Sequence, residues 1–445
     1  MKRLAGILLS LVLLVTTIFI GCESNKKDEN QTPIQKTSDK SNTTEKKPGD
    51  LNGEITIWEY SSELMKKIVE GFNQVYPNIK VSTVPVDGSA YDQKLQTTLS
   101  AGGELPDIIW LNYFQRGRLH SLDILENLEA DPYNVDRSKI LDWVVDLGSN
   151  ERGELVSIET GPAPTGIVYR RDIVKEYLGT DDPEELGNMF KDFDTFIEKI
   201  KVIKEKSNDE ILPFSSIGDA YTILDGITSV PYIKNGNLNI MEVCNTVFPK
   251  LEAMVNDGLV GKIDQWSPAY NASFASGKYA FGICPMWAPD YLIKPNAEGE
   301  SGKFGVIAPP GGKMFNFGGT SNGIWKDSKN KELAWEYMRW TLLTVEGQKL
   351  MSEAGGGGIG PLKEPYQIEG FYSKPDEFFG GQDLSKFWAE NINNVSVRLL
   401  TKNDNIFGSA MGLGVSAIKT GLNAEEAAKK VEDEVILKLP EFKNN

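Results

Sequence analysis

Aromatic rings stand beside carboxylate or amide side chains at several points where an apolar run of this sequence ends. Such pairs suit a ligand rich in hydroxyl groups, because flat rings cover its C–H faces. Carboxylates and amides can bond its hydroxyls. Binding pockets usually combine a mostly apolar wall with a few polar groups of this kind. The candidate binding residues are Glu59, Tyr60, Asn112, Tyr113, Asp219, Tyr221, Trp287, Asp290 and Tyr291.

Trp287 is the strongest of these candidates. Pro285 and Pro289 flank it and predict a loop rather than a strand, where a ring is less needed for packing. Any single aromatic residue can equally belong to the core. The acidic candidates have alternatives as well, a solvated side chain or a helix cap. Trp266 and Phe407 are weaker binding candidates.

The sequence gives little indication of a catalytic or metal-binding site. His120 is the only histidine, so we expect neither a histidine-based metal site nor a catalytic triad, and no cofactor. The glycine run at residues 355–361 lacks the Gly-Lys-Ser/Thr end of a nucleotide loop, and we interpret it as a flexible return. With 63 acidic residues, the sequence alone leaves open a carboxylate pair placed for glycoside hydrolysis.

The elements that must position these residues begin with alternating strands and helices. Ile55 and Ile57 alternate with polar neighbours and predict a strand over 53–60. Helical spacing of apolar residues follows, then a strand at 79–86, a second helix and an apolar strand at 106–111. This order predicts βαβ units and a mainly parallel sheet. Further strands are expected at 163–170 and 278–287, with helices at 192–206, 243–258, 330–344 and from Asn423 onward.

The N-terminus has the features of a secretory signal. Lys2 and Arg3 precede an apolar run over residues 4–20, which ends in Gly21 and Cys22. The stretch resembles a bacterial lipoprotein signal, with residues 1–21 removed and Cys22 lipidated, for example by palmitate. Residues 22–50, the lipidated Cys and its tether, are too polar to fold. The alternative is an uncleaved membrane anchor; both place the rest of the chain outside the cell.

The chain is acidic, and this excludes some partners. Its formal net charge is −16, and without Lys2 and Arg3 it has 45 basic against 63 acidic residues. No excess of Lys or Arg exists to neutralise nucleic-acid phosphates or to dock directly on anionic lipid. Cys244 and Cys284 lie in apolar settings and are interpreted as buried free thiols, although a disulfide between them stays open.

Four stretches in the same order carry a family resemblance. They are GEITIWEY with FNQVYPNIKV, LSAGGELPDIIWLNYFQRGRLHSLDILENLEAD, FASGKYAFGICPMWAPDYL, and KFGVIAPPGG with FGGTSNGIWKDSKNKELAWEYMRWTLLTVEGQKLM. Together they resemble the family 1 extracellular solute-binding proteins, sugar-binding subunits of ABC importers related to maltose-binding protein. VYRRD at residues 168–172 departs from the family's usual Tyr-Asn-Lys.

The resemblance implies an α/β fold of the type II periplasmic-binding-protein kind. It would have two lobes, each a mainly parallel sheet flanked by helices, with a ligand cleft between them. We place lobe one at 53–161 plus 314–350 and lobe two at 162–313 plus 351–445. By the same resemblance, Trp287 would stack on a sugar ring and Tyr221 would line the second lobe.

The expected function is capture of a carbohydrate, favouring an oligosaccharide, and its delivery to the permease subunits of an ABC importer. The resemblance implies a monomer that is not an enzyme and needs no cofactor. It would be held at the outer face of the cell membrane through its lipid anchor only, without binding nucleic acid. The alternatives are a surface glycoside hydrolase or polysaccharide-processing enzyme, and a ligand-binding partner of a membrane sensor.

Overall fold

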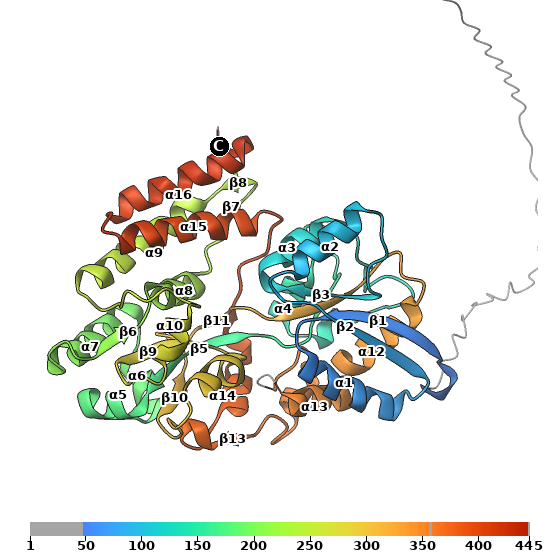
Figure 1. Ribbon diagram of the computed structural model, residues 1–445, viewed down its shortest axis with the longest axis horizontal. Coiled ribbons are helices and arrows are strands. Elements are labelled where there is room, and N and C mark those ends of the chain that lie inside the picture. The colour runs from blue at the N-terminus through green and yellow to red at the C-terminus, as the bar shows by residue number, and fades with distance from the viewer. Residues whose placement is uncertain (1–47, 356–357, 444–445) are drawn as a thin grey trace, which may run out of the picture. The chain divides into compact units, whose positions relative to one another are not determined.

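The computed structural model describes residues 48–355 and 358–443 (Figure 1). The expected signal at 1–21, the lipidation site Cys22 and all but the last residues of the 22–50 tether lie outside this part of the chain, as do positions 356 and 357 of the glycine run. Within residues 48–355 and 358–443, no helix combines the length and the apolar character that a bilayer span requires.

The first sheet starts from the predicted βαβ units. Its strands β2, β1 and β3, taken from the edge inward, are parallel and joined by helices α1 and α2, whereas β12 pairs antiparallel with both β3 and β4. The sheet is therefore mixed rather than mainly parallel, because β12 returns from much later in the chain. In sheet order the strands are β2 (Ile79–Pro85), β1 (Gly53–Glu59), β3 (Ile108–Asn112), β12 (Thr320–Ile324) and β4 (Ile158–Glu159).

The second sheet is built around β5, every residue of which is buried. Its neighbours β9, β10 and β11 all run antiparallel to it, whereas β9 pairs in parallel with β6 and β11 with β15, so this sheet is mixed as well. A continuous apolar run fits burial on both faces but does not fix strand direction. The strands are β15 (Val395–Ser396), β11 (Met314–Asn316), β5 (Pro164–Arg170), β9 (Tyr279–Pro285) and β6 (Leu212–Phe214), with β10 (Phe304–Ile307) beside β5.

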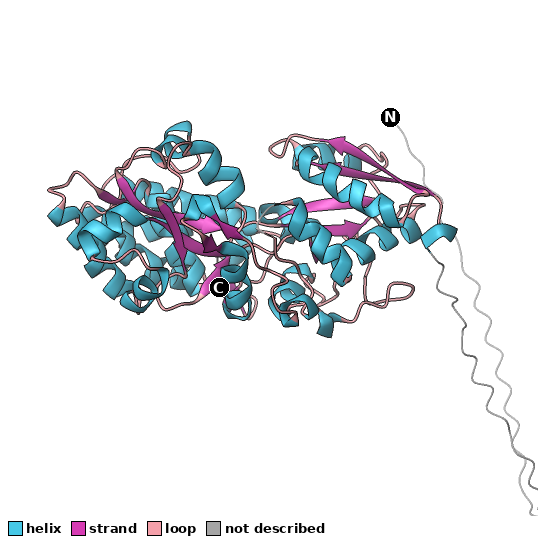
Figure 2. Ribbon diagram, turned by 90° about the horizontal axis from the view of Figure 1, so that it is seen from below, coloured by secondary structure: helices cyan, strands magenta, loops and turns pink. Residues whose placement is uncertain are grey.

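Helices surround the strands, as Figure 2 shows. The predicted helices are present within a few residues of their expected ends, and Asn423 caps the last one by accepting a hydrogen bond from the Glu426 amide. The helices are α1 (Ser62–Val75), α2 (Tyr91–Ser100), α3 (Tyr113–Ser121), α4 (Asp142–Gly148), α5 (Arg171–Leu178), α6 (Pro183–Met189), α7 (Phe193–Lys206), α8 (Ile217–Thr228), α9 (Ile240–Asn256), α10 (Pro268–Ser273), α11 (Lys294–Asn296), α12 (Lys331–Leu343), α13 (Val345–Ala354), α14 (Leu384–Asn391), α15 (Asp404–Lys419) and α16 (Ala424–Lys438). Two short hairpins, β7 (Ile233–Lys234) with β8 (Asn237–Leu238) and β13 (Pro375–Asp376) with β14 (Gln382–Asp383), complete the described elements.

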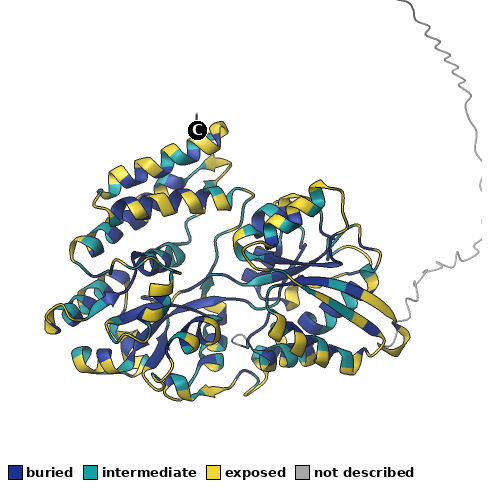
Figure 3. Ribbon diagram, in the orientation of Figure 1, coloured by how far each residue is buried: buried dark blue, intermediate teal, exposed yellow. Residues whose placement is uncertain are grey.

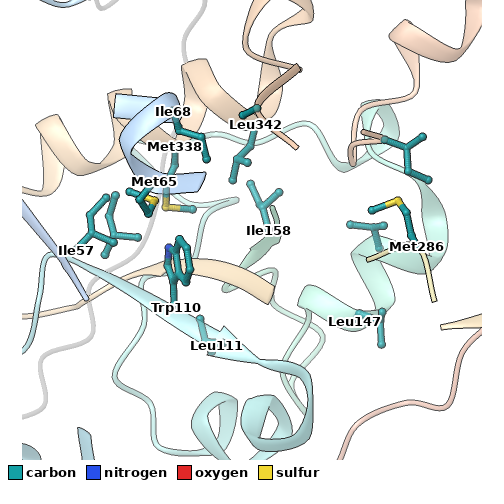
Figure 4. Packing of buried hydrophobic residues seen from close by; sticks show 14 of the residues in the cluster. Ile57, Met65, Ile68, Trp110, Leu111, Leu147, Ile158, Met286, Met338 and Leu342 are labelled. Carbon is teal, nitrogen blue, oxygen red and sulfur yellow. The ribbon is translucent and has the colours of Figure 1, made fainter. Parts of the chain in front are cut away.

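Buried side chains gather on the strands and on the inward faces of the helices (Figure 3). One apolar cluster surrounds the first sheet and reaches Met286 and Trp388; Figure 4 shows part of it. The other joins α7 and α8, which pack on strands of the second sheet, to α9, α15 and α16, which pack on one another. Cys244 and Cys284 are both buried free thiols. Phe407, a weak binding candidate, is fully buried in the second cluster.

The chain passes between the sheets at residues 160–163, at 317–319 and again after Tyr372, since the Lys363 amide still donates to the Lys139 carbonyl and the Tyr372 hydroxyl accepts from the Gly360 amide. The second passage lies later than the sequence-based boundary. Met314–Asn316 pairs with β5 and β15, so the return to the first sheet follows Asn316 instead of beginning at residue 314. The described residues on either side of positions 356 and 357, expected in lobe two, contact the first lobe. Lys67 Nζ donates to the Ala354 carbonyl at 3.0 Å and the Leu141 amide donates to the Pro361 carbonyl at 2.9 Å.

Candidate ligand-binding site

A cavity of about 340 Å³ opens where residues from both sheets meet. Tyr60 and Asn112 reach it from the carboxyl ends of β1 and β3, and Trp287 and Tyr291 reach it from the segment after β9. Parallel strands direct their carboxyl ends to one edge of a sheet, the usual place for a ligand in open α/β folds. Four of the nine residues predicted from the sequence therefore line one cavity.

Two of these four are held in place by polar contacts. The Tyr60 hydroxyl shares a hydrogen bond with the Thr320 hydroxyl, which links β1 to the start of β12. Burial raises the pKa of Tyr60, so the phenol stays neutral near physiological pH. Asn112 is the N-cap of α3, and its side-chain oxygen accepts from the Phe114 amide at 3.1 Å. Both side chains are thus fixed before any ligand arrives.

The acidic candidates do not line the cavity. Glu59 is buried, and its carboxylate accepts from the Ser61 amide at 2.5 Å and the Ser62 hydroxyl at 2.6 Å. These bonds fix the first turn of α1, the capping alternative that the sequence left open. Asp290 is exposed and forms an ion pair with Lys294. Asp219 is buried at the start of α8.

Tyr113 and Tyr221 also lie away from the cavity lining. Both are electrostatically coupled to Arg398 and Asp225. The Arg398 guanidinium binds both carboxylate oxygens of Asp225, at 2.7 and 2.9 Å, and lies 4.1 Å from the centre of the Tyr232 ring. Burial raises the pKa of Tyr113 to about 12. Both tyrosines are half-buried and lie near this ion pair instead of lining the cavity.

A row of rings extends from the cavity, and sequence reasoning identified only part of it. Ring centres are 5.8 Å apart for Phe114 and Phe317, 6.3 Å for Phe317 and Trp266, and 6.0 Å for Trp266 and Trp287. Phe114 is 55% exposed and Trp266 46%, unusually high values for large apolar side chains. We call these four residues the aromatic row. Phe114 lies in α3, Phe317 lies in the passage at 317–319, Trp266 precedes α10 and Trp287 follows β9.

Trp287 is oriented by the backbone of the passage between the sheets. Its indole N–H donates to the Phe317 carbonyl at 3.3 Å, which leaves the flat faces of the ring for packing or binding. Gly318 lies against the same ring with φ +95°. A Cβ at Gly318 would lie only 2.7 Å from the indole nitrogen. The glycine therefore permits both the backbone conformation and the position of the ring.

Gly318→Ala is expected to weaken ligand binding about tenfold, because the new methyl group must displace Trp287 in addition to straining the backbone. Gly236→Ala is the matched control. Gly236 also has a positive φ, +81°, but a Cβ there would meet no atom within 4 Å. Calorimetric titration with ligand should separate the variants. Equal affinity for the two would contradict the positioning role of Gly318.

The cavity lining is uncharged. Among the described residues that form it, none is Asp, Glu, Lys, Arg or His, and the polar groups are hydroxyls and amides such as Asn112, Thr160, Thr320 and Asn322. A charged ligand would lose its hydration there without an opposite charge. A neutral ligand with many hydroxyl groups fits these partners. The carboxylate pair that glycoside hydrolysis requires is absent from the described lining.

A buried ion pair lies behind the cavity. Arg116 and Glu159 are both 0% exposed and bind each other, and Glu159 Oε2 would lie 3.1 Å from a Cβ at the cavity residue Gly319. Burial raises the pKa of Glu159, whereas Arg116 opposes that rise. Burial, followed by the charge of Arg116, lowers the pKa of His120 to about 3, so the imidazole is neutral. In residues 48–355 and 358–443, no three His, Cys, Asp or Glu side chains are grouped to hold a metal ion.

Comparison with known proteins agrees with this geometry. The family model of bacterial extracellular solute-binding proteins matches residues 58–349, and the chain belongs to that family. The chain is similar to the lactose-binding protein of Rhizobium radiobacter, with 26% identity over 86% of this chain and 92% of the relative. It is also similar to the arabinooligosaccharide-binding protein of Bacillus subtilis (strain 168), with 24% identity over 78% of each.

A solved structure supports the fold. The galacto-N-biose-/lacto-N-biose I-binding protein of the ABC transporter from Bifidobacterium longum, in complex with lacto-N-biose, has a TM-score of 0.70 to this chain. The match covers 88% of this chain and 98% of that one at 18% identity, so it bears on the fold alone. The family resemblance and the two-lobed α/β fold predicted from the sequence are confirmed, and the chain is a solute-binding protein, not an enzyme.

Proposed function

We propose that this chain captures a neutral oligosaccharide in its cleft and delivers it to the permease subunits of an ABC importer. The observation that carries the proposal is the aromatic row beside an uncharged cavity. Aromatic rings suit the C–H faces of successive sugar units, and the neutral hydroxyls and amides suit their O–H groups. The lactose- and arabinooligosaccharide-binding relatives support the same ligand class.

Delivery would depend on closure of the two lobes. We propose that residues 53–161 with 317–372 form lobe one, and that 162–316 with 373–445 form lobe two, a revision of the sequence-based boundaries. Ligand contacts made by Tyr60 and Asn112 on one lobe and Trp287 on the other would favour the closed state, which the transporter can recognise. The protein would act as a monomer, without a cofactor.

The proposal is tested by binding without turnover. A panel of mono- and oligosaccharides is screened by thermal shift, since a ligand that binds only the native state raises the melting temperature. Nine tryptophans provide an independent fluorescence signal for titration. We expect saturable binding of a neutral oligosaccharide that is recovered intact by chromatography. Formation of cleaved or rearranged sugar would contradict the binding function.

Outside the described residues, we propose that Cys22 is lipidated after removal of residues 1–21, so that the mature protein is anchored at the outer face of the membrane. The support is the pattern of Lys2, Arg3, the apolar run and Gly21-Cys22. The family description as extracellular agrees with a location beyond the cytoplasm.

Cys22→Ser is expected to move most of the protein from the detergent phase to the aqueous phase in a detergent partition of expressing cells, because the acyl chains supply the membrane affinity. Cys244→Ser is the control and should stay in the detergent phase, since Cys244 is buried in the folded body. If both variants remain in the detergent phase, the N-terminal segment is an uncleaved membrane anchor instead.

A further inference from the structure

We propose that Asp219 is a positioning residue that holds Trp266 in the aromatic row through Gln265 and Tyr270. The inference rests on the proposed function, because it assigns a role to a residue behind the saccharide site. The sequence suggested that Asp219 binds ligand directly. Its carboxylate is 1% exposed and lies in the first turn of α8, so the structure favours an indirect role.

Asp219 binds both sides of the turn that carries Trp266. Its Oδ1 accepts from the Gln265 side-chain amide at 2.7 Å and from the Tyr270 hydroxyl at 2.8 Å. Gln265 directly precedes Trp266, and the Tyr270 ring meets the Trp266 ring at a centre distance of 5.6 Å. One buried carboxylate oxygen therefore holds both Gln265, the residue before Trp266, and Tyr270, whose ring packs against the indole.

Trp266 requires such support because its conformation is unusual. Its φ is +66°, a region that side chains other than glycine, asparagine and aspartate rarely adopt. Its ring is 46% exposed yet lies within 10° of parallel to Phe317. A strained, exposed residue persists only where several surrounding contacts hold it in place, and such residues are concentrated at binding sites.

The space around Gln265 is tightly filled. A Cβ at Gly218 would lie 2.7 Å from Gln265 Oε1, so the glycine lets this side chain approach the start of α8. Asp219 Oδ2 faces strand β9, since a Cβ at Gly282 would lie 3.6 Å from it. Burial raises the pKa of Asp219 to about 7, although Tyr270 and Gln265 oppose the rise. The carboxyl group is costly to bury, which is consistent with a role beyond packing.

The test is a double-mutant cycle between Asp219 and Trp266. Asp219→Ala is expected to weaken binding of the best saccharide from the thermal screen about tenfold, and the same change in a Trp266→Ala background to add less than about twofold. Asp219→Asn keeps an acceptor oxygen and should retain affinity within about threefold. Thr222→Val, which alters a different buried polar side chain of α8, should leave affinity unchanged. Additive losses in the cycle would overturn the proposal.

A second measurement needs no ligand. Acrylamide quenching is compared between each protein and its Trp266→Phe counterpart, and the difference reports on the Trp266 ring. We expect Asp219→Ala and Gln265→Ala to increase this accessibility; Gln265→Ala serves if the Asp219 variant does not fold. Unchanged quenching in both would overturn the inference. Failure of every saccharide to bind the wild type would instead overturn the proposed function, while quenching still decides the role of Asp219.

Discussion

Trp287→Ala is expected to weaken saccharide binding about 30-fold or more, the loss typical of a central aromatic contact of about 2 kcal/mol. Trp287 lines the cavity, lies 6.0 Å from Trp266, and uses its only polar atom to bond the Phe317 carbonyl. Its remaining surface is a flat apolar face. Removing it leaves the ligand without one of the two rings, Trp287 and Phe114, that both line the cavity and belong to the aromatic row.

The same substitution should lower the melting temperature by only a few degrees. The ring is half-buried, and the lost hydrogen bond contributes about 1 kcal/mol. Trp335→Ala is the matched control, since Trp335 is also half-buried but packs on Tyr133, outside the cavity lining. Its affinity for saccharide should equal that of the wild type. A large loss of stability with affinity retained would show that Trp287 is a core residue.

Arg116→Met is expected to reduce the free energy of unfolding by about 3–5 kcal/mol, because it leaves the Glu159 carboxylate buried without its partner. Both side chains are 0% exposed, so water does not replace the lost ion pair. Urea unfolding at pH 7 measures the effect through the midpoint of the transition. The double variant Arg116→Met/Glu159→Gln should recover part of the loss, since it removes the unpaired charge.

An exposed ion pair provides the comparison for this second prediction. Arg152 and Asp123 bind each other at 2.8 Å with more than half of each side chain exposed. Arg152→Met should therefore change the unfolding free energy by about 1 kcal/mol or less. If Arg116→Met costs no more than Arg152→Met, the buried pair is not an important source of stability behind the cavity.

Local patterns predicted the elements of this fold well but predicted their pairing poorly. The alternation of Ile55 and Ile57 and the helical spacing in α1 depend on neighbouring residues alone, and both elements appear where expected. The direction and partners of β11, β12 and β15 depend on contacts across hundreds of residues. Short strands carry little signal of their own, since strand preference reflects the neighbours against which they pack.

Local sequence likewise predicted some of the residues that line the cavity and missed others. Tyr60, Asn112 and Trp287 were found because they follow apolar strands. Tyr113 was among the predicted binding residues and Phe114 was not. The two are neighbours on a helix, so their side chains point in different directions. The orientation of α3 brings Phe114 to the cavity. Asp219 was predicted to bind ligand because it stands beside Tyr221 where an apolar run ends. Its burial depends on contacts with Gln265 and Tyr270 that the local sequence does not reveal.

Small-angle X-ray scattering with and without a saturating saccharide tests the central claim most directly, that rings from both lobes close on a captive ligand. The radius of gyration should fall when the saccharide identified by thermal shift is added. It should fall much less for Trp287→Ala at a saccharide concentration that fills most wild-type sites but, at about 30-fold weaker affinity, only a minority of the variant's sites. An unchanged radius for the wild type, at a concentration where fluorescence shows the site to be full, would contradict closure of the lobes around the ligand.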